Sequence, residues 1–232
     1  MLILIKNRDD IMKEKIYAFY KGIATIGLYI LLQTAAISIF YDFIKSNNHL
    51  KNSIGMLCIY IFMLIGLAIF YRKKLISDFK NFKKENVNIA LKNWIIGLGV
   101  MIISNIILTQ ILNNIAVNES ANRELLTNFP ISNFFIMVLI APLIEEITFR
   151  ASFQKAFSNW LPFSIFTGLL FGFFHIADLK SITEYLFIIP YGALGFFFAK
   201  AMYETNNIYT SYIAHVIHNF MCVSLILLMG VL

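Results

Sequence analysis

The amino-acid sequence predicts an all-α membrane protein, a polytopic bundle of about seven (roughly six to eight) transmembrane helices. Of its 232 residues, 59% are hydrophobic and only 14% are charged, whereas soluble domains carry about 25% charged residues. The mean hydropathy is +0.74. Apolar runs near the length of about 20 residues that crosses a bilayer recur along the chain. They are residues 16–40, 53–71, 89–115, 131–150, 161–176, 185–201 and 208–232.

The orientation of these spans is predicted from Lys and Arg in the segments between them, which favour the cytoplasmic side. Residues 72–85 (RKKLISDFKNFKKE) hold Arg72 and five lysines and are expected to be cytoplasmic. Residues 117–130 hold only Arg123 against Glu119 and Glu124, so they are expected outside. Counting spans places the N-terminus in the cytoplasm and, with seven spans, the C-terminus outside the cell membrane.

The net charge of +6 is explained by this topology and by contact with the anionic lipid bilayer, and no nucleic-acid partner is expected. A docking role for a basic loop is the alternative. The apolar stretch within residues 1–15 is too short for a cleavable signal peptide. Cys58 and Cys222 lie within apolar runs and are interpreted as small buried side chains rather than as a disulfide framework.

Ionisable residues divide the chain into two parts of a single integral-membrane domain. Residues 1–130 form about three spans, whose only charged residues are Lys21 and Lys92 near the span ends, and are interpreted as a scaffold. Residues 131–232 are interpreted as the catalytic core. Their spans carry Glu145, Glu146, Arg150, His175, His215 and His218.

Two adjacent carboxylates, Glu145 and Glu146, lie in the run 131–150. A charge at membrane depth costs ~3 kcal/mol on insertion scales, so such residues are functional candidates. Residues four apart share a helix face, so Glu146 can pair with Arg150 while Glu145 points about 100° away. Pro142 is expected to kink this helix and to free a carbonyl for a neighbour or water. The alternative is that both glutamates have only a structural role and hold helices together by pairing with Arg150, although one arginine cannot neutralise two carboxylates.

Two further polar patterns follow. In FGFFH, Phe171 and His175 share a helix face, and a GxxxG pair (Gly168 and Gly172) allows a close approach between helices. In HVIHN, His215 and Asn219 share a face, with His218 offset toward the site or toward a neighbouring helix. Each pattern alone is also explained by hydrogen bonding or packing between helices.

Together, the three patterns place a glutamate, two histidines and an asparagine on three helices that could meet at a water-filled cavity. A carboxylate in a low-dielectric pocket is a competent general base. A histidine can position the attacking water, and a second histidine with an amide can hold an oxyanion. This set suits amide hydrolysis. The HExxH, GxSxG and GxGD motifs of other membrane proteases are missing from the sequence.

The motifs EEITFR, FGFFH and HVIHN resemble the EExxxR, FxxxH and HxxxN motifs of the CAAX-protease and bacteriocin-processing (CPBP) family, in the same order. Ala141-Pro142 precedes the first motif and residues 205–208 (TNNI) precede the third. The resemblance covers about residues 131–221. Ala151 replaces a glycine that usually follows the arginine, and His218 is an additional histidine.

The resemblance implies an intramembrane endopeptidase acting on a membrane-associated peptide or protein substrate. Glu145 and His175 would activate water, His215 and Asn219 would bind the oxyanion, and Glu146, Arg150 and Phe171 would support them. Relatives in eukaryotes trim prenylated CaaX tails, and those in bacteria are linked to peptide-signal or bacteriocin processing, self-immunity and surface regulation. The Lys-, Asn- and Ile-rich composition favours a bacterial role.

Three questions stay open at this stage. No tightly bound cofactor is expected, but zinc held by Glu145, His175 and His215 is the alternative. His175 is about 22 Å along its helix from Trp160, so it meets Glu145 only if this helix is tilted or begins deep in the membrane, or if the cavity extends outward. The competing functions are a non-catalytic membrane immunity or interaction protein and a proton- or ion-coupled transporter.

Overall fold

The computed structural model describes residues 8–230, and within this range the chain forms helices and no strand. Six helices are long and apolar enough to cross a membrane, by length and composition. They are Arg8–Ile39, His49–Lys80, Lys84–Leu112, Pro130–Ala156, Glu184–Thr205 and Ile208–Met229. The predicted fold class, a polytopic helical bundle, is therefore confirmed, and the protein is a multi-pass membrane protein.

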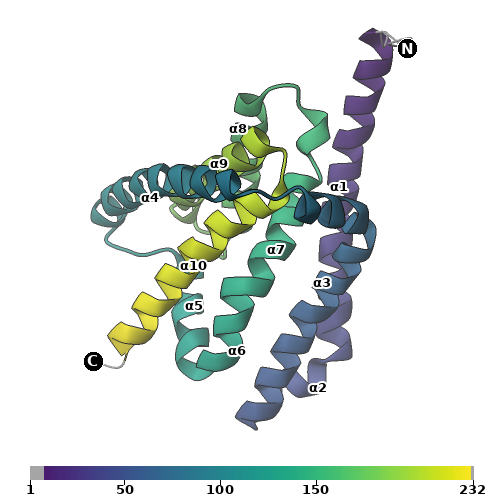
Figure 1. Cartoon of the computed structure of the whole chain (residues 1–232). Coiled ribbons are helices and arrows are strands. Elements are labelled where there is room, and N and C mark those ends of the chain that lie inside the picture. The colour runs from purple at the N-terminus through teal and green to yellow at the C-terminus, as the bar shows by residue number, and fades with distance from the viewer. Residues whose placement is uncertain (1–7, 231–232) are drawn as a thin grey trace.

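The helices are numbered α1 to α10, and several are short. The long ones are α1 (Arg8–Ile39), α3 (His49–Lys80), α4 (Lys84–Leu112), α9 (Ile188–Thr205) and α10 (Ile208–Gly230). The short ones are α2 (Tyr41–Ile44), α5 (Val117–Asn128), α6 (Pro130–Phe135), α7 (Ala141–Glu145) and α8 (Trp160–Phe174). Figure 1 shows α1 and α3 side by side, with α4 running crosswise to both.

Two sequence predictions are corrected in detail. The fifth predicted span, residues 161–176, is α8, which has only 15 residues and does not meet the length of a span. The basic segment 72–85 was expected as a loop, but α3 continues to Lys80 and α4 begins at Lys84. Its lysines therefore extend the two helices, because Lys and Arg are good helix formers. Met1–Asn7, part of the segment that bears on the signal-peptide prediction, lie outside the described residues.

Helices α8 and α9 approach each other closely through glycines. A Cβ built on Gly168 would lie 2.8 Å from the carbonyl oxygen of Gly192 and 2.9 Å from the backbone nitrogen of Phe196. A Cβ on Gly172 would lie 2.7 Å from the carbonyl oxygen of Ile188. Only hydrogen fits at these positions, which confirms the predicted role of the GxxxG pair. The contact fixes the end of α8, where His175 lies.

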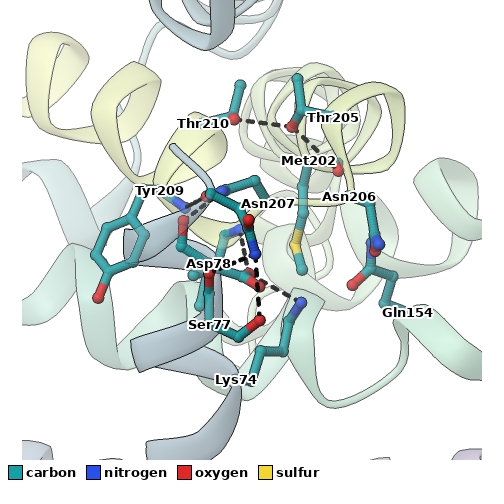
Figure 2. Close-up of polar contacts among 12 residues, drawn as sticks. Lys74, Ser77, Asp78, Gln154, Met202, Thr205, Asn206, Asn207, Tyr209 and Thr210 are labelled. Carbon is teal, nitrogen blue, oxygen red and sulfur yellow. Dashed lines mark hydrogen bonds and ion pairs between the residues drawn. The ribbon is translucent and has the colours of Figure 1, made fainter. Parts of the chain in front are cut away.

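A polar junction joins the end of α3 to the turn between α9 and α10 (Figure 2). Asn206 ends α9 in the left-handed conformation at φ 50°, which Asn tolerates. The backbone N–H of Ile208 donates to Asp78 Oδ2 at 2.8 Å, and Lys74 pairs with the same oxygen at 2.9 Å. Asn207 Nδ2 donates to the Asp78 carbonyl at 2.6 Å. Asp78 thus provides an acceptor for a backbone N–H that has no partner within its own helix, at the start of α10, the helix that carries HVIHN.

The helix that carries Glu145 and Glu146 is irregular. Within Pro130–Ala156, two π-helical segments flank α7: η1 (Ile136–Ile140) and η2 (Glu146–Ala151). A 3₁₀ turn, η3 (Gln154–Ala156), follows, and a second 3₁₀ turn, η4 (Glu184–Phe187), precedes α9. Short π segments inside α-helices are common at functional sites.

Candidate active site

Pro142 explains the first π segment and the position of Asn219. The N–H of Ala141 donates to the Ile136 carbonyl, five residues back. The Met137 carbonyl would need its donor from residue 142 in this register, and proline has none. Asn219 Nδ2 of α10 donates to that carbonyl at 2.7 Å. The predicted freed carbonyl is therefore met by a neighbouring helix.

Glu146 is completely buried and lies at the centre of an ionic cluster. Its Oε1 is 3.1 Å from Arg150 Nη1, and both side chains are 0% exposed. The predicted pairing of Glu146 with Arg150 is thus present. The same Oε1 accepts a hydrogen bond from His215 Nδ1 at 2.9 Å. One buried carboxylate therefore meets two potentially cationic groups from two helices.

Arg150 is also held by aromatic rings. Its guanidinium carbon lies 4.2 Å from the ring centroid of Phe171 and 6.0 Å from that of Phe198. Its Nη2 lies 3.5 Å from the Gly195 carbonyl. A cation over an aromatic face is attracted by the ring quadrupole, so Phe171 supports the buried arginine.

Glu145 differs from its neighbour because its side chain is 21% exposed. Its Oε2 lies 3.6 Å from His215 Nε2 and has no hydrogen-bond partner among residues 8–230. His215 therefore lies between the two carboxylates, with Nδ1 on Glu146 and Nε2 toward Glu145. The histidine ring that directly faces Glu145 is His215, and His175, which sequence reasoning placed beside Glu145, lines the same cavity.

His175 caps the end of α8 and stands between two aromatic rings. Its Nδ1 lies 2.8 Å from the Phe171 carbonyl, which only accepts, so Nδ1 carries the proton and Nε2 presents a lone pair. The His175 ring stacks on Tyr191 with centroids 4.9 Å apart and lies 4.1 Å from Phe171. This packing fixes the orientation of the imidazole.

His218, whose direction the sequence left open, lines the same cavity as the other two histidines. It is buried, its Nε2 lies 3.6 Å from Cys222 Sγ, and its Nδ1 has no partner among the described residues.

A cavity of about 340 Å³ connects these groups. Glu145, His175, His215, His218, Asn219 and Phe171 all line it. The cavity extends to Asn118, Glu119 and Asn122 of α5, the segment expected on the outer side of the membrane. Glu145 and His175 therefore share one cavity, and its extension toward α5 is one of the three arrangements by which the sequence allowed them to meet.

The three proposed zinc ligands do not fit a metal site in this arrangement. Within the described range 8–230, no group of three or more His, Cys, Asp and Glu side chains is placed to hold a metal ion. Both nitrogens of His215 face carboxylates, and His175 Nδ1 faces a backbone carbonyl. We therefore derive no step through a metal.

Sequence reasoning missed the contribution of the N-terminal half to this cavity. Tyr29 of α1 and Tyr60 of α3 line it with Glu145, and Asn118 and Glu119 line it from α5. Tyrosines inside apolar spans gave no signal, because a tyrosine ring also serves as an ordinary packing residue. Residues 117–130 were interpreted only as an outer connection.

Together, the fold and this cluster define a class: a multi-pass helical membrane protein with a buried Glu–Arg–His cluster beside an accessible carboxylate. Residues 127–221 match the family model of type II CAAX prenyl endopeptidase Rce1-like proteins. The match contains all three motifs and confirms the resemblance to the CAAX-protease and bacteriocin-processing family over this segment.

The chain is also similar to an uncharacterized protein of Mycoplasma capricolum. The two are 31% identical over 170 residues, which is 67% of this chain and 48% of the relative. The chain therefore spans about half the length of the curated relative it matches. No solved structure matches the chain.

Proposed function

We propose that this protein is an intramembrane endopeptidase that hydrolyses a peptide bond of a membrane-associated peptide or protein substrate. The observation that carries the proposal is the environment of Glu145, a carboxylate 21% exposed in a cavity with one oxygen unpartnered among the described residues. Its neighbour Glu146 is fully buried and doubly paired. Because Glu145 is the more accessible of the two carboxylates, it is suited to general-base catalysis.

The charges of the cluster support this division. Two carboxylates face one guanidinium, so a protonated His215 would supply the second positive charge. Both of its N–H groups would then point at carboxylates, Nδ1 at Glu146 and Nε2 at Glu145. His215 would thus link the supporting carboxylate of Glu146 to the proposed base Glu145.

In the proposed reaction, Glu145 takes a proton from a water molecule that His175 Nε2 helps to orient. The resulting hydroxide attacks the substrate carbonyl carbon, and the carbonyl oxygen becomes an oxyanion. The His215 Nε2–H and the second amide hydrogen of Asn219 are proposed as its donors. When the C–N bond breaks, the proton held by Glu145 passes to the leaving amine, which restores the carboxylate.

Position-specific variants test this proposal. Glu145→Gln, His175→Ala and His215→Ala should each abolish cleavage while the protein still accumulates in the membrane. Glu124→Gln, at an exposed position of α5, is the matched control and should keep activity. Membrane proteomics of wild type against Glu145→Gln would identify the substrate whose processing stops. Full complementation by all three variants would instead favour a non-catalytic immunity or interaction role.

Metal removal is a second test, since the proposed mechanism uses no metal. Purified protein treated with a chelator should keep its activity. Stoichiometric zinc that is lost together with activity would contradict this version of the mechanism.

We further propose a place in a bacterial cell membrane with the N-terminus in the cytoplasm, from the Lys and Arg distribution. The substrates proposed are peptide signals or bacteriocins, or proteins involved in self-immunity. Cysteine-accessibility labelling at Ser46 and Asn81, in the connections at either end of α3, would test the orientation. Labelling of Asn81→Cys from the outside would contradict it.

A further inference from the structure

The cavity has a second polar end, away from the ionic cluster, which the proposed reaction does not use. We call this end the α5 pole and define it as Asn118, Glu119, Asn122, His218 and Cys222, all of which line the cavity. The Tyr191 ring lies between His175 and the α5 pole. It stacks on the His175 ring, and its hydroxyl accepts a hydrogen bond from Asn118 Nδ2 at 3.3 Å.

Helix α5 is fixed in place at this end of the cavity. The backbone N–H of Val117 at its start faces both oxygens of the buried Glu184 carboxylate at 3.3 Å. Leu126 near its other end is buried in a cluster with Val138 and Val223. The side chains of α5 that line the cavity are therefore held by the fold rather than carried on a loose connection.

Glu119 has one oxygen available to a ligand. Arg123 contacts it through Nε at 3.2 Å and Nη2 at 2.6 Å, and both contacts go to Oε1. The described residues provide no hydrogen bond to Oε2. Arg123 itself does not line the cavity, so the negative side of this ion pair faces inward.

The charges of the residues that line the cavity favour a positively charged ligand over a negatively charged one. Among the described residues that line the cavity, Glu119 and Glu145 are acidic and none is Lys or Arg. His218 lines it as well, is 9% exposed, and has its Nδ1 without a partner in the described chain. An unpartnered buried polar atom of this kind is one that a bound polar group can satisfy.

We infer that the α5 pole is a specificity subsite that binds a lysine or arginine side chain of the substrate, close to the scissile bond. This inference rests on the proposed proteolytic function and names the substrate class for the same cavity. Glu119 Oε2 accepts from the substrate cation, and the amides of Asn118 and Asn122 complete its hydrogen bonding. An acidic side chain at that substrate position meets the Glu119 carboxylate and is rejected.

The distance along the substrate is short. The ring of Tyr191 lies between His175 and the α5 pole: its centroid is 4.9 Å from that of His175, and its hydroxyl is 3.3 Å from Asn118 Nδ2. An extended peptide advances ~3.3 Å per residue. The recognised side chain therefore lies within the first few residues on one side of the cleaved bond.

The test uses the full-length protein in lipid nanodiscs with apolar peptides that differ only in one residue. Lys, Arg, Gln, Met or Glu is placed in turn at each of about three positions on both sides of the cleaved bond. Wild type should cleave the Lys or Arg peptide about fivefold better than the Gln peptide at one of these positions, the size typical of a partly exposed ion pair. The Glu peptide should be the poorest.

Two variants of α5 distinguish recognition by a specific subsite from a general effect of the protein's charge. Glu119→Gln should bring the Lys-to-Gln ratio close to one. Glu124→Gln makes the same charge change on the same helix but at an exposed position outside the cavity lining, so the ratio should stay as in wild type. An equal change in both variants, or no preference for a basic residue at any position, would overturn the inference.

Binding measurements distinguish failure of the subsite from failure of the proposed function. Fluorescence anisotropy with the same peptides is measured on Glu145→Gln, which cannot catalyse the proposed reaction. One outcome is that the Lys peptide binds preferentially, that Glu119→Gln removes this preference, and that wild type cleaves no peptide. This outcome would support the subsite and contradict proteolysis. Cleavage without any charge preference in either assay would support proteolysis and overturn the subsite.

Discussion

Helix α3 and the helix Pro130–Ala156 both have the length of a span, but they bury their residues differently. In its most apolar window, α3 buries 22% of its residues, against 50% for Pro130–Ala156. The buried residues of α3 are spaced four apart over most of its length, on one narrow stripe: Gly55, Ile59, Met63, Leu67 and Tyr71. Pro130–Ala156 is instead buried on every side from Glu146 to Ala151.

This difference shows where charged side chains can be placed. A helix that is buried only along a narrow stripe, such as α3, turns most of its surface to lipid, where a charge has no partner. A helix enclosed by α1, α3, α8 and α10 can hold Glu146 and Arg150 among protein groups. Its backbone also departs from the α-helical register at two places, whereas α3 is continuous for 32 residues. Enclosure and irregularity thus occur together at the candidate site.

The largest expected effect comes from breaking the buried ion pair. Arg150→Leu should lower the free energy of unfolding by about 3–5 kcal/mol, because Glu146 would lose its main buried counter-charge. Arg123→Gln is the matched control, since Arg123 and Glu119 form another pair four residues apart but with side chains 43% and 35% exposed. It should cost less than about 1 kcal/mol. Equal losses, measured in mixed micelles, would contradict the enclosed cluster.

A smaller effect is expected where α8 meets α9. Gly168→Ala should cost about 1–3 kcal/mol, since its Cβ would press on the backbone of α9. Gly99→Ala in α4 meets nothing within 4 Å and should be neutral or stabilising by up to ~1 kcal/mol. Thermal unfolding of both variants checks the close approach, and a neutral Gly168→Ala would refute it.

The sequence predicted this packing and the ion pair better than it predicted the cavity. Glu146 and Arg150 are four residues apart on one helix, so their pairing depends only on local geometry. The hydrogen bond from Asn219 to the Met137 carbonyl joins residues 82 apart, and only the proline hinted that such a donor was needed. The position of His215 between both carboxylates depends on how α10 crosses the irregular helix, which spacing alone does not encode.

The short α8 and the contribution of α5 were also beyond the sequence argument. Hydropathy marks residues 161–176 as apolar but does not tell a span from a helix that packs along α9. Residues 117–130 appeared only as an outer polar segment, because the place of Asn118 and Glu119 in the cavity wall depends on the position of α5. The catalytic roles assigned to Glu145, His175, His215 and Asn219 stay predictions.

The smallest effect is expected at the one buried charge of α3, which lies at its end. Asp78→Ala should destabilise the protein by about 1–2 kcal/mol, because the Ile208 N–H loses its acceptor and Lys74 its partner. Asn81→Ala, one turn further on, removes only an exposed side-chain contact to Ser77 and should change the unfolding midpoint little. A neutral Asp78→Ala would mean that the junction does not hold the start of α10.

The most direct test of the central claim compares Glu145→Gln with Glu146→Gln, two adjacent and chemically identical changes, in one preparation. The free energy of unfolding and the rate of peptide cleavage are measured for both. Glu145→Gln should unfold within about 1 kcal/mol of wild type and lose cleavage by about 10²–10⁴-fold. Glu146→Gln should lose about 3–5 kcal/mol of stability, since Arg150 would be left without its carboxylate. A stable, active Glu145→Gln protein would contradict the assignment of Glu145 as the catalytic base.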